Sequence, residues 1–492
     1  MTSQNSSDGS YPRDEIELAS RIPLPASTST IFAADSDYAI GSSEALGGAN
    51  ASVLPPTDGG IRAWSFLAAA FVVEAIVWGF PNAYGVFLGS YLQDPRYASQ
   101  KSAASLLPLI GTLSSGIIYC SGPFVNPIAA RFPQHRRKSM WFGAVLCSGS
   151  LLGASYANEI FQLVLLQGVV YGVGGALLYL PCISYMSEWF VARRGMANGI
   201  LFAGTAVGGA VLPFLLPPLI ASYGSSKTLR ILAIAIAISL VPLLSLVKGR
   251  LPHTRARISG PAPRGAPKAQ DWMRTKTFWL FLATNTLQAL AYFVPIVYLP
   301  TFANNLHISS SNSAVALAML NVASVLGRLS MGYLSDKFNP WLLALVTLLS
   351  TSVATFVLWG ILSHSFGGLL AFGIAYGSIA GGWSSLWTGF VRPIAKDDPA
   401  VSTALYGYIL LSRGIGNIVS TPISAKLYAT PHNMTGSTGT GFDVGDGRFE
   451  NMIIYVGTCF AGAAAIAALG WGMEARKSLT SPVGRDQRRD SE

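Results

Sequence analysis

The chain alternates between long apolar runs and short polar segments. Each run holds roughly 20 mostly apolar residues, the length that an α-helix needs to cross a hydrocarbon layer about 30 Å thick. The pattern predicts twelve such helices, six on either side of a basic, proline-rich segment. The first six are expected at Trp64–Leu92, Leu106–Ala130, Ser139–Tyr156, Ile160–Met186, Met196–Ile220 and Leu229–Val247. The second six are expected at Thr277–Phe302, Ser313–Leu334, Trp341–Leu362, Phe366–Ile394, Thr403–Tyr428 and Met452–Met473.

This pattern divides the chain into five parts. Residues 1–57 are rich in Ser, Asp, Ala and Pro and are expected to form a disordered cytosolic tail. Two six-helix halves are expected at 58–247 and 277–475, with a cytosolic linker at 248–276 and a second cytosolic tail at 476–492. Composition agrees, because only 11% of the residues are charged, whereas soluble domains carry about 25%. So little charge cannot coat a water-soluble fold, and we expect a multi-pass protein in a lipid bilayer.

Positive charge gathers at one end of the predicted helices. With the amino terminus inside the cell, the cytosolic loops hold Arg131, Arg193, Arg194 and further Lys and Arg residues, whereas the outer loops hold few. Lys and Arg are retained on the cytosolic side, so both termini are predicted to be cytosolic. The expected location of the protein is the plasma membrane. The net charge of +10 therefore reflects topology rather than a nucleic-acid partner. The same orientation places a candidate N-glycosylation sequon, at Asn433, in the longest outer loop.

Short motifs recur between the two predicted halves. Gly168-Val-Val-Tyr171-Gly172 in the fourth helix returns as Gly373-Ile-Ala-Tyr376-Gly377 in the tenth. A glycine pair in the fifth helix recurs in the eleventh. A basic residue followed by Phe occurs after the second helix and again after the eighth, and these repeats lie at nearly the same offset. The repeats predict an all-α membrane fold of two pseudo-symmetric halves.

Three further stretches carry a more specific signal. They are Asp58-Gly59-Gly60 with Ala63-Trp64 at the first helix, Trp189 to Gly199 at the start of the fifth, and Gly332-Tyr-Leu-Ser-Asp336-Lys337 after the eighth. The first two resemble signatures of the monocarboxylate transporter family, and the third resembles a loop motif of the major facilitator superfamily that contains it. The Ser-rich tail and the variant signatures are most similar to the fungal branch of that family.

The resemblance implies a major facilitator fold, alternating access, and a central cavity surrounded by helices one, eight and eleven. Two positions depart from the animal members of the family. Asn82 stands where those members have a Lys, and Ser324 stands where they have an Asp one turn before the arginine that matches Arg328. A lactate–proton mechanism therefore cannot be carried over directly.

Three charged residues lie deep inside predicted helices: Glu74, Arg328 and Arg413. A charge there costs roughly 2.5–3.5 kcal/mol on insertion scales, so it tends to face a cavity and to mark function. A guanidinium stays charged and offers a planar pair of donors, which predicts that Arg328 or Arg413 receives an anionic group of the substrate. Glu74 is either a proton carrier, since burial favours the neutral acid, or the partner of one arginine in a structural ion pair.

Polar side chains in the helices and charges in the loops are further candidates. The first group, which can hydrogen-bond a substrate or only a neighbouring helix, comprises Asn82, Tyr171, Ser324 and Tyr376. The second group, a predicted gating loop, comprises Arg131, Asp336 and Lys337. A carboxylate such as Asp336 can bind the amino terminus of an adjacent helix in one conformational state only.

The function expected from these features is secondary active transport of a small, anionic organic metabolite, with protons as the candidate coupling ion. Uptake of a monocarboxylate and export of a fungal secondary metabolite both fit. A nutrient receptor that no longer transports is an alternative of another class, although the linker and carboxyl tail are short for signalling extensions. An enzyme is disfavoured because the five histidines stand singly. No Gly-Lys-Ser/Thr phosphate loop supports ATP drive, and no cofactor or metal is expected.

Overall fold

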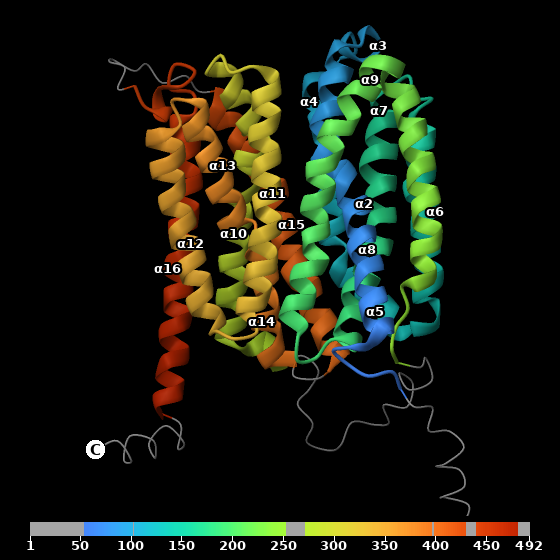
Figure 1. Ribbon diagram of the computed structural model, residues 1–492, viewed down its shortest axis with the longest axis vertical. Coiled ribbons are helices and arrows are strands. Elements are labelled where there is room, and N and C mark those ends of the chain that lie inside the picture. Colours follow the sequence, from blue (N-terminus) through green and yellow to red (C-terminus); the bar gives the residue numbers. More distant parts are fainter. Residues whose placement is uncertain (1–53, 102, 252–270, 396–397, 430–438, 481–492) are drawn as a thin grey trace, which may run out of the picture. The chain divides into compact units, whose positions relative to one another are not determined.

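Helices make up every regular element in the part of the chain that the computed structural model describes, residues 54–101, 103–251, 271–395, 398–429 and 439–480 (Figure 1). The predicted tail before Leu54, most of the predicted linker and the sequon at Asn433 lie outside the described residues. Residues from Pro55 onward group into one compact unit.

Figure 1 shows the helices in two bundles, coloured blue to green and yellow to red. The first bundle holds α2 (Gly60–Gln93), α3 (Pro95–Ala98), α4 (Ala103–Cys120), α5 (Gly122–Arg131), α6 (Arg136–Ala154), α7 (Ile160–Leu163), α8 (Tyr171–Trp189) and α9 (Arg194–Leu246). The second bundle holds α10 (Lys276–Asn305), α11 (Ser310–Ser335), α12 (Pro340–Ala354), α13 (Phe366–Ala380), α14 (Trp383–Ala395), α15 (Pro399–Ala429) and α16 (Glu450–Thr480). A π-helical segment at Val164–Val170 joins α7 to α8, and another at Thr355–Leu362 extends α12. Short 3-10 helices lie at Pro133–His135, Asp271–Arg274 and Gly441–Asp443.

Each of the twelve predicted segments coincides with helical residues, but the breaks between them differ from the prediction. The fifth and sixth segments belong to one helix, α9, in which only Gly224 has non-helical angles (φ 77°, ψ 166°). Glycine tolerates this positive φ, so the chain reverses there without an extended loop. The second segment is bent by 41° between α4 and α5. By length and composition, eight of the described helices can cross a membrane, or nine if that bent pair is one span.

The bundles pack against each other chiefly through α9 with α11, and through α15 with α4, α5 and α8. Small residues allow the first of these contacts to be close. A Cβ added at Gly199 of α9 would lie only 2.6 Å from the carbonyl oxygen of Arg328 on α11. Backbone-to-backbone approach of this kind is typical of helix pairs in membranes, where small residues line the interface.

Candidate functional site

A cavity of about 720 Å³ lies between the two bundles. One end of it is lined by residues near helix ends, including Leu88 of α2, Pro108 of α4, Thr301 of α10 and Ala425 of α15. The other end is lined by residues from the middle of helices, including Glu74. α2 runs toward one end of the first bundle, and α4 starts from that same end. The first set of residues therefore lies near that end, at the mouth of the cavity, and the second set lies deeper, at its base.

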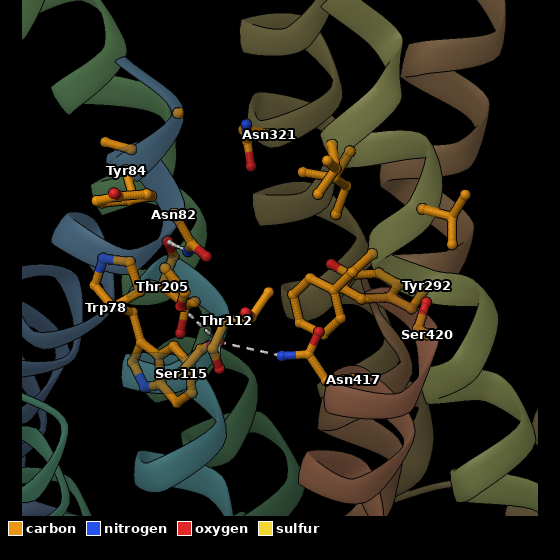
Figure 2. Close-up of a pocket in the computed structure, with 18 of the residues that line it drawn as sticks. Trp78, Asn82, Tyr84, Thr112, Ser115, Thr205, Tyr292, Asn321, Asn417 and Ser420 are labelled. Carbon is orange, nitrogen blue, oxygen red and sulfur yellow. Dashed lines mark hydrogen bonds between the residues drawn. The ribbon is translucent and has the colours of Figure 1, made fainter. Parts of the chain in front are cut away.

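Figure 2 shows side chains of both bundles facing each other across this cavity. Trp78, Tyr84 and Thr112 lie on one side, and Tyr292 and Ser420 lie on the other. A hydrogen bond from Asn417 Nδ2 to Ser115 Oγ, 3.2 Å long, joins the two sides near the base. The walls therefore combine aromatic faces with hydroxyl and amide groups, a lining suited to an amphipathic organic molecule.

Glu74 lies at the cavity base and is only 1% exposed. One carboxylate oxygen accepts a 2.9 Å hydrogen bond from Thr205 Oγ1, and the other has no partner among the described residues. Neither Arg328 nor Arg413 comes within 4.0 Å of this carboxylate, since the ion pairs in the described part of the chain lie elsewhere. The structural ion pair considered above is therefore not formed in this conformation.

Arg328 also lies at the base and is anchored at two of its three nitrogens. Nε donates to the carbonyl oxygen of Gly381 at 3.1 Å, and Nη1 donates to the carbonyl oxygen of Phe202 on α9. Nη2 has no partner among the described residues and is not sealed from the cavity. The anchored guanidinium therefore presents one charged donor to an incoming group.

Arg413 is held in a different way. Nη1 donates to Gln288 Oε1 at 2.7 Å, and the guanidinium carbon lies 4.7 Å from the ring centre of Tyr292. The rings of Phe293, Trp387 and Tyr119 have their centres 5.5, 5.6 and 5.8 Å from the same carbon. Cation–π attraction within about 6 Å partly replaces the water that this buried charge has lost. As with Arg328, Nη2 has no partner among the described residues and is not sealed off.

The four polar helix residues divide into one that lines the cavity and three that do not. Asn82 lines it and donates from Nδ2 to the Thr205 carbonyl oxygen at 3.4 Å. Tyr171 donates to the Val77 carbonyl oxygen at 3.1 Å, and Tyr376 donates to the Tyr292 carbonyl oxygen at 2.9 Å. Both tyrosines thus hydrogen-bond neighbouring helices, the second of the two roles predicted for them. Ser324 is buried, outside the cavity lining, and its hydroxyl has no partner among the described residues.

Sequence reasoning missed the amides on α10 that support the base. Asn285 accepts hydrogen bonds from the indole nitrogens of Trp383 and Trp387 at 2.8 and 3.1 Å, and its Nδ2 donates to the Ile409 carbonyl oxygen at 2.9 Å. One turn later, Gln288 binds Arg413. The detectable signal was a pair of polar residues spaced three apart within an apolar helix. Asn285 fixes the orientation of Trp387, which lines the cavity.

The predicted gating residues lie at the end opposite the cavity mouth. The Asp336 carboxylate accepts 2.9 Å hydrogen bonds from the backbone nitrogens of Gly195 and Met196, in the first turn of α9. Lys337 and Arg131 make local contacts instead, 4.4 Å from the Tyr333 ring centre and 5.8 Å from the Phe132 ring centre. Of the three, only Asp336 hydrogen-bonds the other bundle within the described residues.

Asp58 binds the segment just before α9 from the side of the first bundle. Its carboxylate accepts hydrogen bonds from the backbone nitrogens of Val191, Ala192 and Arg193 at 3.0, 3.0 and 2.8 Å. Together with Asp336, it satisfies backbone donors that a helix start otherwise leaves unpaired. The start of α9 is thus held by one carboxylate from each bundle.

Further polar contacts close the same end. Asn198 of α9 donates to the Tyr406 hydroxyl of α15 at 2.5 Å, and Asn126 of α5 donates to the Thr403 carbonyl oxygen at 2.9 Å. The bundles are therefore joined at the Asp336 end, while the cavity reaches the opposite end. Among the described residues, no group of three or more His, Cys, Asp and Glu side chains could hold a metal ion.

Known proteins resemble this chain along most of its length. The Major Facilitator Superfamily profile matches residues 59–421. The MFS transporter asaE of Aspergillus flavus is 26% identical over 84% of this chain and 89% of its own length. The aspyridones efflux protein apdF of Emericella nidulans is 26% identical over 76% of this chain and 73% of its own length. The solved structure of the proton:xylose symporter XylE superimposes with a TM-score of 0.60 at 15% identity, covering 82% of this chain and 94% of XylE, which shows a shared fold.

Proposed function

The chain belongs to the Major Facilitator Superfamily, and from this premise we propose that it is a secondary active transporter that exports a drug-sized organic acid with an aromatic or apolar body. The superfamily consists of multi-pass membrane transporters rather than enzymes. Relatives named as efflux proteins support export over the alternatives of monocarboxylate uptake and nutrient sensing.

The observation that carries the substrate proposal is the size and lining of the central cavity. Its volume of about 720 Å³ falls within the range of roughly 300–1,000 Å³ that holds drug-sized ligands. A short monocarboxylate would leave most of that space empty and would contact few of the walls. The aromatic residues of the lining are Trp78, Tyr84, Tyr119, Tyr179, Phe202, Tyr292, Phe293, Tyr298 and Trp387. Such walls favour a ring system or a branched apolar chain.

The charges at the base support an acidic group on the same molecule. Arg328 and Arg413 each keep one nitrogen free toward the cavity, whereas Glu74 contributes one negative charge at most. We propose that these two Nη2 atoms receive the anionic group, and that Asn82 hydrogen-bonds the body of the substrate. Donors held in place before binding cost little ordering entropy, so such a site discriminates well between an acid and its neutral ester.

Glu74 is the proposed proton carrier. It is buried at the base, has one unpartnered oxygen and forms no ion pair in this conformation. A proton taken up from outside while the cavity is open there, and released inside, would supply the free energy for export. Transport driven in this way needs no nucleotide.

Alternating access is proposed to move residues 58–247 against 277–475. The basic residues Arg193, Lys337 and Arg392, in loops or near a helix end, stand at the end closed by Asp336, which the positive-inside rule assigns to the cytosol. On that assignment both termini are cytosolic, the cavity opens outward, and the conformation is the one from which an exporter releases its substrate. The plasma membrane is the proposed location, and glycosylation at Asn433 is a further proposal that a gel-mobility shift after endoglycosidase treatment would test.

The experiment that tests the function is transport by the purified chain in proteoliposomes. The panel of labelled acids runs from short monocarboxylates to acids with several rings, with an imposed pH gradient of either sign. We expect transport of the large acids, driven by the gradient, and little transport of the short ones. Transport of short monocarboxylates alone would overturn the substrate proposal, and no dependence on the pH gradient would overturn proton coupling.

A further inference from the structure

A shallow surface groove of about 410 Å³ lies where the start of α10 meets the end of α16. Its lining consists of Arg274, Lys276, Trp279, Leu280 and Met473. These five residues, called the α10–α16 groove below, share no member with the central cavity. The groove is therefore separate from the candidate transport site.

The two cations of the groove are unpaired within the described residues. Neither Arg274 nor Lys276 makes a hydrogen bond or an ion pair there. The carboxylate nearest to the groove along α16, Glu474, is not part of the lining. By contrast, Arg96 and Arg136, at the ends of other helices, bind Asp94 and Glu188 at 2.6 and 3.1 Å. The groove thus keeps two positive charges available for a negative ligand.

The rest of the lining matches the boundary between lipid and water. Trp279 is 57% exposed, and its indole nitrogen donates to the Met273 carbonyl oxygen at 2.7 Å, which orients the ring. On α16, Trp471 lies two residues before Met473 and is 41% exposed. Tryptophans collect where apolar spans meet headgroups. Figure 1 shows α16 continuing past the ends of the neighbouring helices at this end. The groove therefore lies at headgroup depth.

We propose that the α10–α16 groove binds an anionic glycerophospholipid, with its phosphate between Arg274 and Lys276 and an acyl chain against Leu280 and Met473. The start of α10 adds to the attraction, because Thr275 makes no side-chain cap hydrogen bond there and the first backbone N–H groups of a helix have no partner within that helix. This end of the protein is the one that the basic loops assign to the cytosolic leaflet, where anionic lipids concentrate. The proposal does not depend on what the central cavity transports.

The test measures lipid retention by native mass spectrometry of the full chain released from detergent, with phosphatidylserine as the probe. Arg274→Gln combined with Lys276→Gln is compared with Arg137→Gln combined with Lys138→Gln. The control removes the same charge from two exposed cations at the start of α6, which line neither the central cavity nor the groove. All four positions are exposed, so both variants should fold. Two cations of this kind change affinity by roughly 25-fold, or about fivefold each.

We expect the first variant to lose one bound phosphatidylserine, with affinity at least tenfold weaker, and the control to retain it. Phosphatidylcholine should bind equally weakly to both. Equal loss from both variants would show non-specific attraction and overturn the proposal. Displacement of the bound lipid by millimolar inorganic phosphate would assign the groove to a free anion and would overturn it as well.

Discussion

Replacing Arg328 by Gln tests whether the cavity base recognises an acid. The side chain donates from Nε to Gly381 at 3.1 Å and from Nη1 to Phe202, and it keeps Nη2 for the cavity. Glutamine is shorter and uncharged. It can remake at most one of the two backbone contacts, and it presents no charged donor.

The expected magnitude follows from the bond that is lost. A hydrogen bond with a charged partner contributes about 1.5–3 kcal/mol, which corresponds to roughly 10–150-fold in affinity. An acid that binds Nη2 of Arg328 should therefore bind the variant about 10–150-fold more weakly. Its methyl ester carries no charge and should lose less than about threefold, because its body meets the same walls. The ester thus serves as an internal control for folding.

The assay is a binding titration of the purified chain with an acid found in the transport panel and with its ester. Arg413→Gln is measured in parallel, because its Nη2 is the second free donor at the base. Arg392→Gln is the matched control, since Arg392 is exposed near the end of α14 and does not line the cavity. Thermal unfolding of each variant shows whether the loss of backbone contacts has changed the fold.

Equal weakening of the acid and the ester would refute the reasoning for Arg328, because it would mean that the arginine only supports the cavity wall. If Arg413→Gln alone abolished the preference for the acid, the anionic group would bind there. If neither variant reduced that preference, the substrate would not be recognised through its charge at the base.

Three further predictions follow from individual contacts. Glu74→Gln should abolish the effect of a pH gradient on transport while substrate exchange continues; full gradient dependence in the variant would exclude Glu74 as the proton carrier. Asp336→Asn weakens the cap on α9 by about 1 kcal/mol, so labelling of a cysteine introduced at the cavity mouth should slow severalfold as the population of the conformation closed at the Asp336 end falls, and unchanged labelling would argue against a gating role. Asn285→Ala leaves the indole N–H groups of Trp383 and Trp387 unpaired, which should cost about 2 kcal/mol or more in thermal unfolding; an unaltered melting temperature would contradict the network.

A fifth prediction concerns pH and the Asp94–Arg96 ion pair, which lies outside the predicted spans. The hydrogen bonds from Arg96 hold the pKa of Asp94 below its usual range. A lowered pKa stabilises the fold above the unfolded value of about 4, and this stabilisation is lost as the pH falls through the folded pKa. Because Arg96 is half exposed, Asp94→Asn should cost less than about 1 kcal/mol at pH 7. A cost that persisted undiminished at pH 2 would rule out the charge as its source.

The helices were predictable because the bilayer imposes a length and a polarity that each segment must meet alone. Every predicted span coincides with helical residues, and the first span, Trp64–Leu92, lies within α2. The join at Gly224 was not predictable, since a glycine between two apolar runs is also compatible with an open loop. Which helices pack together depends on small residues such as Gly199, whose partner is more than a hundred positions away.

Residues of the candidate site were predictable only where placing the side chain in an apolar helix costs free energy by itself. Glu74, Arg328 and Arg413 were identifiable because a charge in an apolar helix needs a polar environment, and all three line the cavity. Tyr171 and Tyr376 turned toward neighbouring helices instead, and no local signal distinguishes these two directions.

Hydropathy and charge, read from the sequence alone, determined that the chain is a helical membrane protein and which buried charges need an explanation, since both depend on each segment's own transfer free energy. Only the tertiary structure decided the size of the cavity and the partners of its charges. The carbonyl groups that anchor Arg328 lie 53 and 126 positions away, so nothing in its neighbourhood along the chain specifies them. A transfer energy is a property of one segment, whereas a binding cavity is a property of surfaces that meet only after the bundles pack.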